Sequence, residues 1–241
     1  MPDAATVTGC LRPRTLCAIG GQRVRAGRPD RVRLAGVAGR AAVVRYCLRG
    51  SAPPPVTLDD ALRKVVDVHL LFVCTGNVCR SPTAERLVRA YAARLGIPDV
   101  EASSAGTQAL TAQPISPGAA PVLRRLGGDP SGFAARQLTA KVAMSADLVL
   151  TMTEEHRDAV LRLAPRQLGK TFLLSEAAKL ATDHGVCQVA DLASVRFMLT
   201  AQDRPDIRDP FGREADVYAA VGEQIAQLLP PILELCRRTG C

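Results

Sequence analysis

The chain is poor in aromatic residues and in histidine. Its 241 residues include no tryptophan, three tyrosines, five phenylalanines and three histidines. His69, His156 and His184 stand too far apart to show the ligand spacing of a zinc site, and the pair Cys74 and Cys79 is spaced too widely for a zinc knuckle. The sequence therefore gives no sign of a bound metal.

Long apolar runs are missing as well. The first 30 residues contain five arginines with no apolar core between them, so we expect no secretory signal peptide. No uninterrupted apolar stretch approaches the length that spans a bilayer. The eight cysteines are scattered through a chain too large to be a disulfide-stapled miniprotein. We expect a cytoplasmic protein without a membrane span.

Acidic residues are scarce only in the first part of the chain. The net charge is +8, and residues 1–68 carry +7 of it, from 12 Lys and Arg against 5 Asp and Glu, whereas residues 69–241 hold 19 against 18. The basic segment has no dense Lys or Arg run, and Tyr46 is its only aromatic residue. Nucleic-acid binding is therefore not expected.

Three consecutive prolines separate this basic segment from the rest of the chain. Pro53, Pro54 and Pro55 stiffen the backbone and interrupt helices and sheets. We predict a short basic N-terminal extension over residues 1–56, with a hairpin and this Pro-rich linker. A linking helix over 57–67 and one larger domain over 68–241 are expected to follow.

From residue 68 onward, buried-strand and helix patterns alternate. They predict strands at 68–73, 100–104, 147–152 and 171–174, helices at 83–95, 117–126 and 214–237, and further helices after the third and fourth strands. This alternation predicts an α/β fold with a doubly wound, four-stranded parallel sheet and flanking helices. The active site of such a fold is expected at the carboxyl ends of the strands.

A motif with a cysteine and an arginine follows the first predicted strand directly. Residues 74–82 read Cys-Thr-Gly-Asn-Val-Cys-Arg-Ser-Pro and lead into a helix. A loop between a strand and a helix N-terminus turns backbone N–H groups inward, and the helix dipole adds positive potential, so the loop can cradle an anion the size of phosphate. We expect Gly76 to permit a tight turn and Asn77 to adopt a positive φ.

The same motif carries reactive side chains. Cys74, at a helix N-terminus beside an arginine, is predicted to be a thiolate nucleophile. Arg80 presents a planar fork of donors that matches two phosphoryl oxygens, and Ser81 can donate a hydrogen bond to the sulfur. A proton donor must come from elsewhere, and Asp209, in an Asp-Pro-Phe-Gly turn before the last helix, is the candidate. An Asp-Pro pair alone more often marks only a turn.

Residues 68–238 resemble the low-molecular-weight protein-tyrosine phosphatases of bacteria. The resemblance rests on the cysteine motif, on the turn at Asp209, and on matching segments at 104–107, 135–139, 146–152 and 156–157. It implies a flavodoxin-like sheet, no metal or other cofactor, and hydrolysis of phosphotyrosine on proteins through a cysteinyl-phosphate intermediate. The implied partner is a phosphorylated protein, while the oligomeric state is not indicated.

The resemblance also implies residue roles. Cys74 would attack phosphorus, Arg80 would clamp it, and Asp209 would protonate the leaving oxygen and then activate water. Ser104 would help to support the loop, and Cys79 would trap oxidised Cys74 in a reversible disulfide. The implied substrate-binding set is Thr75, Gly76, Asn77, Val78, Cys79, Ser81, Leu110 and Phe211.

Three features depart from the family pattern. Phe133 stands where many members have a histidine that supports the loop. Leu110 falls near a specificity wall where aromatic residues are frequent. Residues 182–208 form a longer stretch than in compact relatives, with an extra helix expected around 189–199, which either covers the pocket as a lid or is inert.

Three alternatives remain open. A protein-arginine phosphatase of the same fold typically has threonine before the second cysteine, whereas the methyl groups of Val78 suit an aromatic phosphoester better. A thiol-coupled arsenate reductase would need a downstream cysteine pair, but Cys187 is the only cysteine between Cys79 and Cys236. A phosphopeptide-binding relic is disfavoured because the nucleophile, the clamp and the acid are all present.

Overall fold

The computed structural model describes residues 68–97 and 100–237 of the chain. The predicted hairpin and linking helix lie in residues 1–67, outside the described residues, so they and the boundaries at 56 and 67 stay predictions. The four predicted strands are confirmed, with bounds of β1 (Val68–Cys74), β2 (Val100–Gly106), β3 (Leu148–Thr151) and β4 (Thr171–Leu173).

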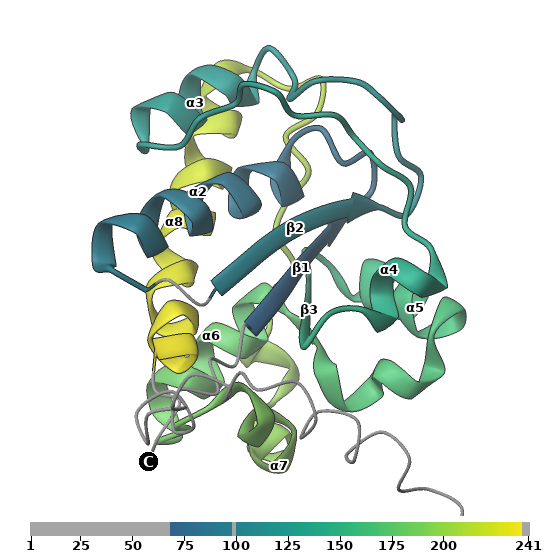
Figure 1. Cartoon of the computed structure of the whole chain (residues 1–241), viewed down its shortest axis with the longest axis vertical. Helices are drawn as coiled ribbons and strands as arrows, with labels where there is room; N and C mark the ends of the chain where they lie inside the picture. Colours follow the sequence, from purple (N-terminus) through teal and green to yellow (C-terminus); the bar gives the residue numbers. More distant parts are fainter. Residues whose placement is uncertain (1–67, 98–99, 238–241) are drawn as a thin grey trace, which may run out of the picture. The chain divides into compact units, whose positions relative to one another are not determined.

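The strands form one parallel sheet in the order β2-β1-β3-β4 (Figure 1). β1 lies centrally and pairs with β2 over its whole length, from Val68 opposite Val100 to Cys74 opposite Gly106. A parallel neighbour requires a crossover connection, which the helices supply. The predicted doubly wound fold with a flavodoxin-like strand order is therefore confirmed.

Helices cover both faces of the sheet. One face carries α2 (Arg80–Leu95), α3 (Ala119–Arg125), α6 (Leu174–Asp183) and α8 (Ala215–Arg237), and the other carries α4 (Ala140–Met144) and α5 (Glu154–Leu163). The sequence did not predict α4, because five residues are too few to show a helical period. No helix in the described part of the chain has the length and apolarity needed to cross a membrane.

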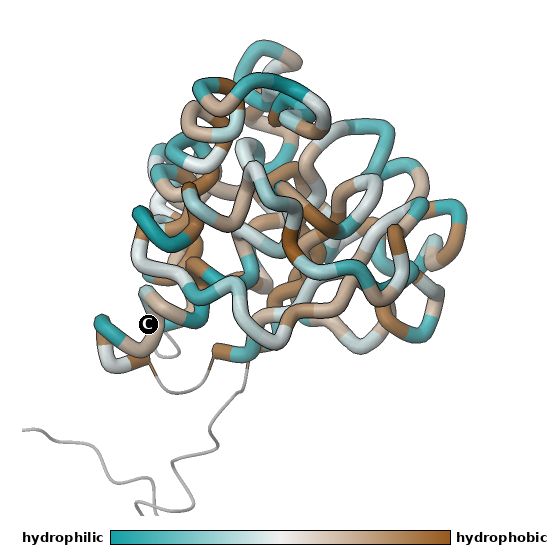
Figure 2. Tube along the Cα trace, turned by 90° about the horizontal axis from the view of Figure 1, so that it is seen from above, coloured by the Kyte–Doolittle hydropathy of each residue, from teal (hydrophilic) through white to brown (hydrophobic). Residues whose placement is uncertain are grey.

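The central strand packs against two separate core layers. Leu70 and Phe72 belong to the larger cluster with α2 and α8, whereas Leu71 and Val73 belong to the smaller cluster with α4 and α5. All four side chains are fully buried. A strand buried on both faces has a nearly continuous apolar sequence, and Figure 2 shows such hydrophobic segments gathered in the interior.

The helix expected around 189–199 forms as three short pieces, namely η2 (Val189–Asp191), α7 (Leu192–Val195) and η3 (Arg196–Met198), and η4 (Ala201–Asp203) follows in the same insertion. Val189 lines a surface hollow together with Val68, the first residue of β1, so the insertion lies toward the amino ends of the strands. Arg196 donates to both carboxylate oxygens of Glu176, at 2.7 and 3.1 Å, and to the carbonyl oxygen of Thr171 on β4 at 2.6 Å. The insertion thus fastens the edge of the sheet.

We expect Arg196→Ala to lower the free energy of unfolding by about 3 kcal/mol, because it leaves a buried carboxylate unpaired. The Glu176 side chain is 0% exposed. The matched control is Arg125→Ala, which breaks an ion pair with Glu223 in which both side chains are more than half exposed, and should cost less than about 1 kcal/mol. Urea denaturation measures both values, and equal losses would contradict the anchoring role of Arg196.

Candidate active site

The loop of residues 74–80 joins the carboxyl end of β1 to the first turn of α2. The carbonyl oxygens of Cys74, Thr75, Gly76 and Val78 accept hydrogen bonds from the backbone N–H groups of residues 107, 108, 110 and 116, at 2.8 to 3.0 Å. Because these carbonyls point outward, the N–H groups of the loop point into the space it encloses. No side chain of the described residues caps this end of α2, and its first turn holds no acidic residue. The loop therefore forms the anion cradle that the sequence predicted.

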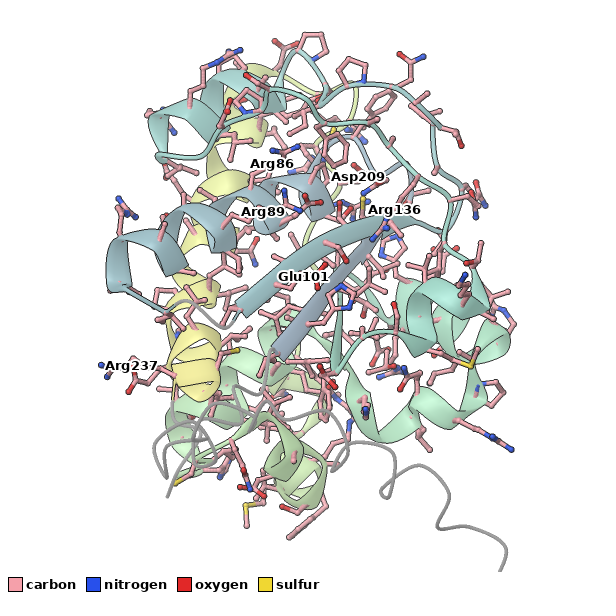
Figure 3. The ribbon with its side chains drawn as sticks, viewed as in Figure 1. Arg86, Arg89, Glu101, Arg136, Asp209 and Arg237 are labelled. Carbon is pink, nitrogen blue, oxygen red and sulfur yellow. The ribbon has the colours of Figure 1, made fainter. Side chains whose placement is uncertain are left out.

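A cavity of about 240 Å³ lies over this cradle. Its walls contain Cys74, Thr75, Gly76, Val78, Cys79, Arg80, Gln108, Leu110, Asp209 and Phe211. The three candidate catalytic side chains thus line one cavity, and Figure 3 places Asp209 near the carboxyl ends of β1 and β2. No residue of the 182–208 stretch lines this cavity, so this stretch does not cover it in the structure.

The left-handed residue of the loop is Asn77 and not Gly76. Asn77 has a φ of 55°, as expected. Gly76 does not have a left-handed backbone, and a Cβ there would meet its nearest neighbours at 3.6 Å, which is ordinary contact. The close approach occurs instead at Gly106 on β2, where a Cβ would lie 2.4 Å from the carbonyl oxygen of Thr75.

Asn77 ties the loop to the sheet behind it. Its side-chain nitrogen donates to the hydroxyl oxygens of Ser81, at 3.0 Å, and Ser104, at 2.8 Å. Its side-chain oxygen accepts from the backbone N–H of Arg136 at 2.8 Å. Asn77, Ser81 and Ser104 are all buried, so they lie behind the cavity rather than in its wall.

The directions of these hydrogen bonds are fixed by a buried carboxylate. The Glu85 carboxylate only accepts, so Ser104 donates to it at 2.6 Å and accepts from Asn77. Ser81 also accepts from Asn77, and its hydroxyl lies 2.9 Å from the sulfur of Cys74. The hydroxyl proton of Ser81 is therefore available to the sulfur, which is a nearer acceptor than the carbonyl oxygen of Ala105 at 3.5 Å.

Sequence reasoning missed Glu85. The residue follows Ser81 by four positions and precedes Val88 by three, which places it on the inward face of α2. A charged residue at such a position needs a partner, and Arg89 lies 3.0 Å away. Phe133, which replaces the expected histidine, packs under the guanidinium of Arg86 at 5.6 Å and makes no recorded polar contact with the loop.

Arg80 is buried, and one of its three guanidinium nitrogens has no hydrogen-bond partner among the described residues. It donates to the carbonyl oxygen of Ile207 at 2.9 Å and to a carboxylate oxygen of Asp209 at 2.5 Å. Its Nε is buried without a hydrogen-bond partner among the described residues. An oxygen of a bound anion would satisfy this donor.

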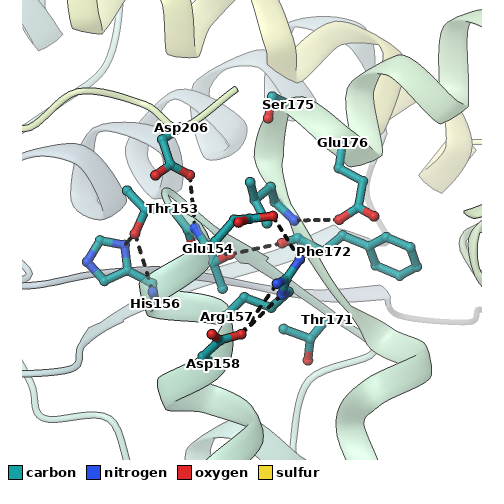
Figure 4. A network of polar contacts seen from close by, with 12 residues as sticks. Thr153, Glu154, His156, Arg157, Asp158, Thr171, Phe172, Ser175, Glu176 and Asp206 are labelled. Carbon is teal, nitrogen blue, oxygen red and sulfur yellow. Dashed lines mark hydrogen bonds and ion pairs between the residues drawn. The ribbon is translucent and has the colours of Figure 1, made fainter. Parts of the chain in front are cut away.

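Asp209 is brought to Arg80 across 129 positions of the chain. The segment before it is fastened to the sheet, because the N–H of Ile207 donates to the carbonyl of Met152 at 2.8 Å. The carboxylate of Asp206 accepts from the N–H of Glu154 at 2.9 Å, at the start of α5 (Figure 4). The segment therefore follows the carboxyl end of β3 and holds Asp209 beside the cradle.

His156 is a second buried polar residue that sequence reasoning did not assign to the site. Its Nε2 lies 2.9 Å from the hydroxyl oxygen of Thr75. Its Nδ1 lies 2.8 Å from the hydroxyl oxygen of Thr153 (Figure 4). Burial, and then the charge of Arg80, lower the pKa of His156 to about 4, so its ring is neutral at neutral pH. Its place in the first turn after β3, at the carboxyl edge of the sheet, was the available signal.

Cys79 is a buried thiol beside the cradle. Its sulfur lies 3.1 Å from the hydroxyl oxygen of Ser116. Burial raises the pKa of Cys79 to about 11, so it is a protonated thiol and does not compete with Cys74 as a nucleophile. Leu110 and Phe211, both about half exposed, line the cavity with apolar side chains, and Gln108 adds a polar side chain that was not predicted.

The fold and the cavity define a cysteine-dependent phosphatase, and comparisons with known proteins agree. Residues 69–193 match the family of low molecular weight phosphotyrosine protein phosphatases, and the chain belongs to this family. The low molecular weight protein-tyrosine-phosphatase Etp of Escherichia coli strain K12 is 42% identical over 107 residues, which are 44% of this chain and 69% of Etp. Wzb of the same strain is 37% identical over 105 residues, 44% of this chain and 68% of Wzb.

Two solved structures have the same fold. A low molecular weight protein tyrosine phosphatase from T. tengcongensis has a TM-score of 0.56 and 33% identity, covering 69% of this chain and 98% of that chain. The YwlE arginine phosphatase from Geobacillus stearothermophilus has a TM-score of 0.56 and 30% identity, covering 70% of this chain and 93% of that chain. The fold therefore occurs with two kinds of phosphorylated residue as substrate.

Two substitutions of Asn77 distinguish the contribution of its left-handed backbone from the contribution of its side-chain hydrogen bonds. Asn77→Gly keeps the left-handed backbone and loses the side-chain bonds, whereas Asn77→Ala loses both, so the alanine variant should be less stable by about 1 kcal/mol. Both variants should lose activity on an aryl phosphate to a similar degree, since both release Ser81. Urea denaturation and kcat/KM check this, and full activity of the glycine variant would contradict it.

Proposed function

We propose that this protein hydrolyses phosphotyrosine on other proteins through a cysteinyl-phosphate intermediate. The observation that carries the proposal is the meeting of Cys74, Arg80 and Asp209 around one cavity whose floor is an inward-facing set of N–H groups. A thiol nucleophile, a planar cation and a carboxyl group are the parts that phosphoryl transfer from an ester requires.

In the first step, the phosphate dianion enters the cradle and its oxygens accept from the loop N–H groups and from the free Nε of Arg80. The thiolate of Cys74 attacks phosphorus opposite the tyrosyl oxygen. As the bond to that oxygen breaks, Asp209 gives it a proton, and phenolic tyrosine leaves. Positioning and charge neutralisation supply most of the catalysis, because the transition state is loose.

In the second step, water replaces the sulfur. Asp209, now a carboxylate, takes a proton from the water that attacks phosphorus. The sulfur leaves as a thiolate and accepts a hydrogen bond from Ser81, whose hydroxyl lies 2.9 Å away. Inorganic phosphate is released and Cys74 is ready for another cycle.

Cys79 supplies a reserve thiol for oxidative conditions. Both Cys79 and Cys74 line the same cavity, and both are free thiols in the structure. If a peroxide oxidises Cys74 to a sulfenic acid, Cys79 can attack that sulfur and release water, forming a disulfide that a thiol reductant reverses. Such a disulfide would protect the nucleophile from irreversible oxidation.

Two variants test the chemistry. Cys74→Ser should abolish hydrolysis of phosphotyrosine and keep the fold.

Asp209→Asn should lower kcat for phosphotyrosine by roughly 10²-fold or more, because the leaving group then departs without a proton. The loss should shrink for a very acidic leaving group such as dinitrophenol, and equal losses for all leaving groups would remove Asp209 from the acid role.

Phosphoarginine is the second candidate substrate, because structural neighbours include an arginine phosphatase. Val78 and the apolar rim of Leu110 and Phe211 favour a phenyl ring over a guanidinium. We expect kcat/KM to be higher for a phosphotyrosine peptide than for its phosphoarginine counterpart. Val78→Thr, which is nearly isosteric, should narrow that ratio by roughly tenfold, whereas Val78→Ala should not. Preference of the unmutated protein for phosphoarginine would overturn the choice of substrate.

A further inference from the structure

The hydroxyl group of Thr75 forms part of the wall of the cavity. Thr75 follows the nucleophile directly and lines the cavity, with its side chain only partly buried. Its oxygen lies 2.9 Å from Nε2 of His156 and 3.4 Å from a terminal guanidinium nitrogen of Arg80. A hydroxyl donates one hydrogen bond and accepts two. Arg80 can only donate, so one acceptor site of the Thr75 oxygen faces Arg80.

The histidine side of this contact has a preferred direction. The hydroxyl oxygen of Thr153 accepts from the backbone N–H of His156 as the cap of α5, at 3.3 Å. Its own proton can then go to Nδ1 of His156, 2.8 Å away, and the structure records no other protein acceptor for it among the described residues. With Nδ1 accepting, the neutral ring carries its proton on Nε2.

This tautomer determines where the proton of Thr75 points. If Nε2–H of His156 donates to Thr75, both acceptor sites of the Thr75 oxygen are filled, by His156 and by Arg80. The hydroxyl proton of Thr75 is then left to point toward the cavity. The opposite tautomer would turn this proton to the ring and leave the Thr153 hydroxyl, which is partly buried, without a protein acceptor among the described residues.

We propose that Thr75 donates a hydrogen bond to a nonbridging oxygen of the bound phosphoryl group, and that His156 is the positioning residue that directs this proton into the cavity. The inference rests on the proposed function and adds a neutral donor to the charged clamp of Arg80. A depressed pKa of about 4 keeps the ring neutral, and therefore able to act as both donor and acceptor, at the pH at which the protein is assayed.

A double-mutant cycle tests whether the two residues act as one unit. Thr75→Val and His156→Phe should each lower kcat/KM for an aryl phosphate by about tenfold or more, as expected for a lost hydrogen bond to a charged group. The kcat/KM of the double variant should be no lower than that of the poorer single variant, because both changes remove the same hydrogen bond to the phosphoryl group. Losses that multiply would overturn the coupling and leave His156 with a merely structural role.

Conservative variants supply the matched controls. Thr75→Ser retains the hydroxyl, so it should retain most of the activity that Thr75→Val loses. His156→Gln retains an N–H at the end of the side chain, so it should retain most of the activity that His156→Phe loses. If His156→Gln is as poor as His156→Phe, the directed proton is ruled out. Thermal unfolding of every variant checks that the protein used in each assay is folded.

A measurement on the unmutated protein does not depend on any variant folding. The chain has three histidines, so the ring nitrogens can be resolved by ¹⁵N NMR, with the His156 signals identified by their loss in His156→Gln. We expect the proton on Nε2 at neutral pH, and a proton on Nδ1 would overturn the proposal. If the unmutated protein hydrolyses no phosphomonoester, the proposed function itself fails. If it is active and the cycle is additive, only this inference fails.

Discussion

The outward hydrogen bonds of the carbonyl groups of residues 74, 75, 76 and 78 are the constraint on which the rest of the site depends. The donors are backbone N–H groups in the segment that follows β2, so the loop can form only where β2 ends beside β1. Gly106 allows this approach, because a side chain there would collide with the carbonyl oxygen of Thr75. Once the carbonyls are turned outward, the N–H groups face a bound anion without further cost.

Two chains of polar side chains support the cradle from opposite sides. One begins at the buried carboxylate of Glu85 and reaches the sulfur of Cys74 through Ser104, Asn77 and Ser81. The other reaches Thr75 from the start of α5. The Ser104 proton goes to the Glu85 carboxylate and the Thr153 proton can go to Nδ1 of His156, so these protons have directions before any substrate arrives, and the site needs little reorganisation to bind it.

Much of the fold could be predicted because its signals are local. β1 is apolar at nearly every position since both of its faces are buried, and the cysteine motif follows it immediately. The short helix α4 gave no periodic signal, and the 182–208 stretch could be recognised as extra but not placed. Its placement depends on Arg196 reaching the buried Glu176 on another helix, and no local pattern encodes such a contact.

The sequence by itself determined the order of strands and helices, the anion-binding loop and the candidates Cys74, Arg80 and Asp209. Only the tertiary structure decided that Asp209 lies beside Arg80, that Glu85 orients the support of the loop, and that His156 contacts Thr75. The physical reason is the range of the interactions. Periodicity and turn preferences act over a few residues, whereas these contacts join side chains that become neighbours only when the sheet and its helices have packed.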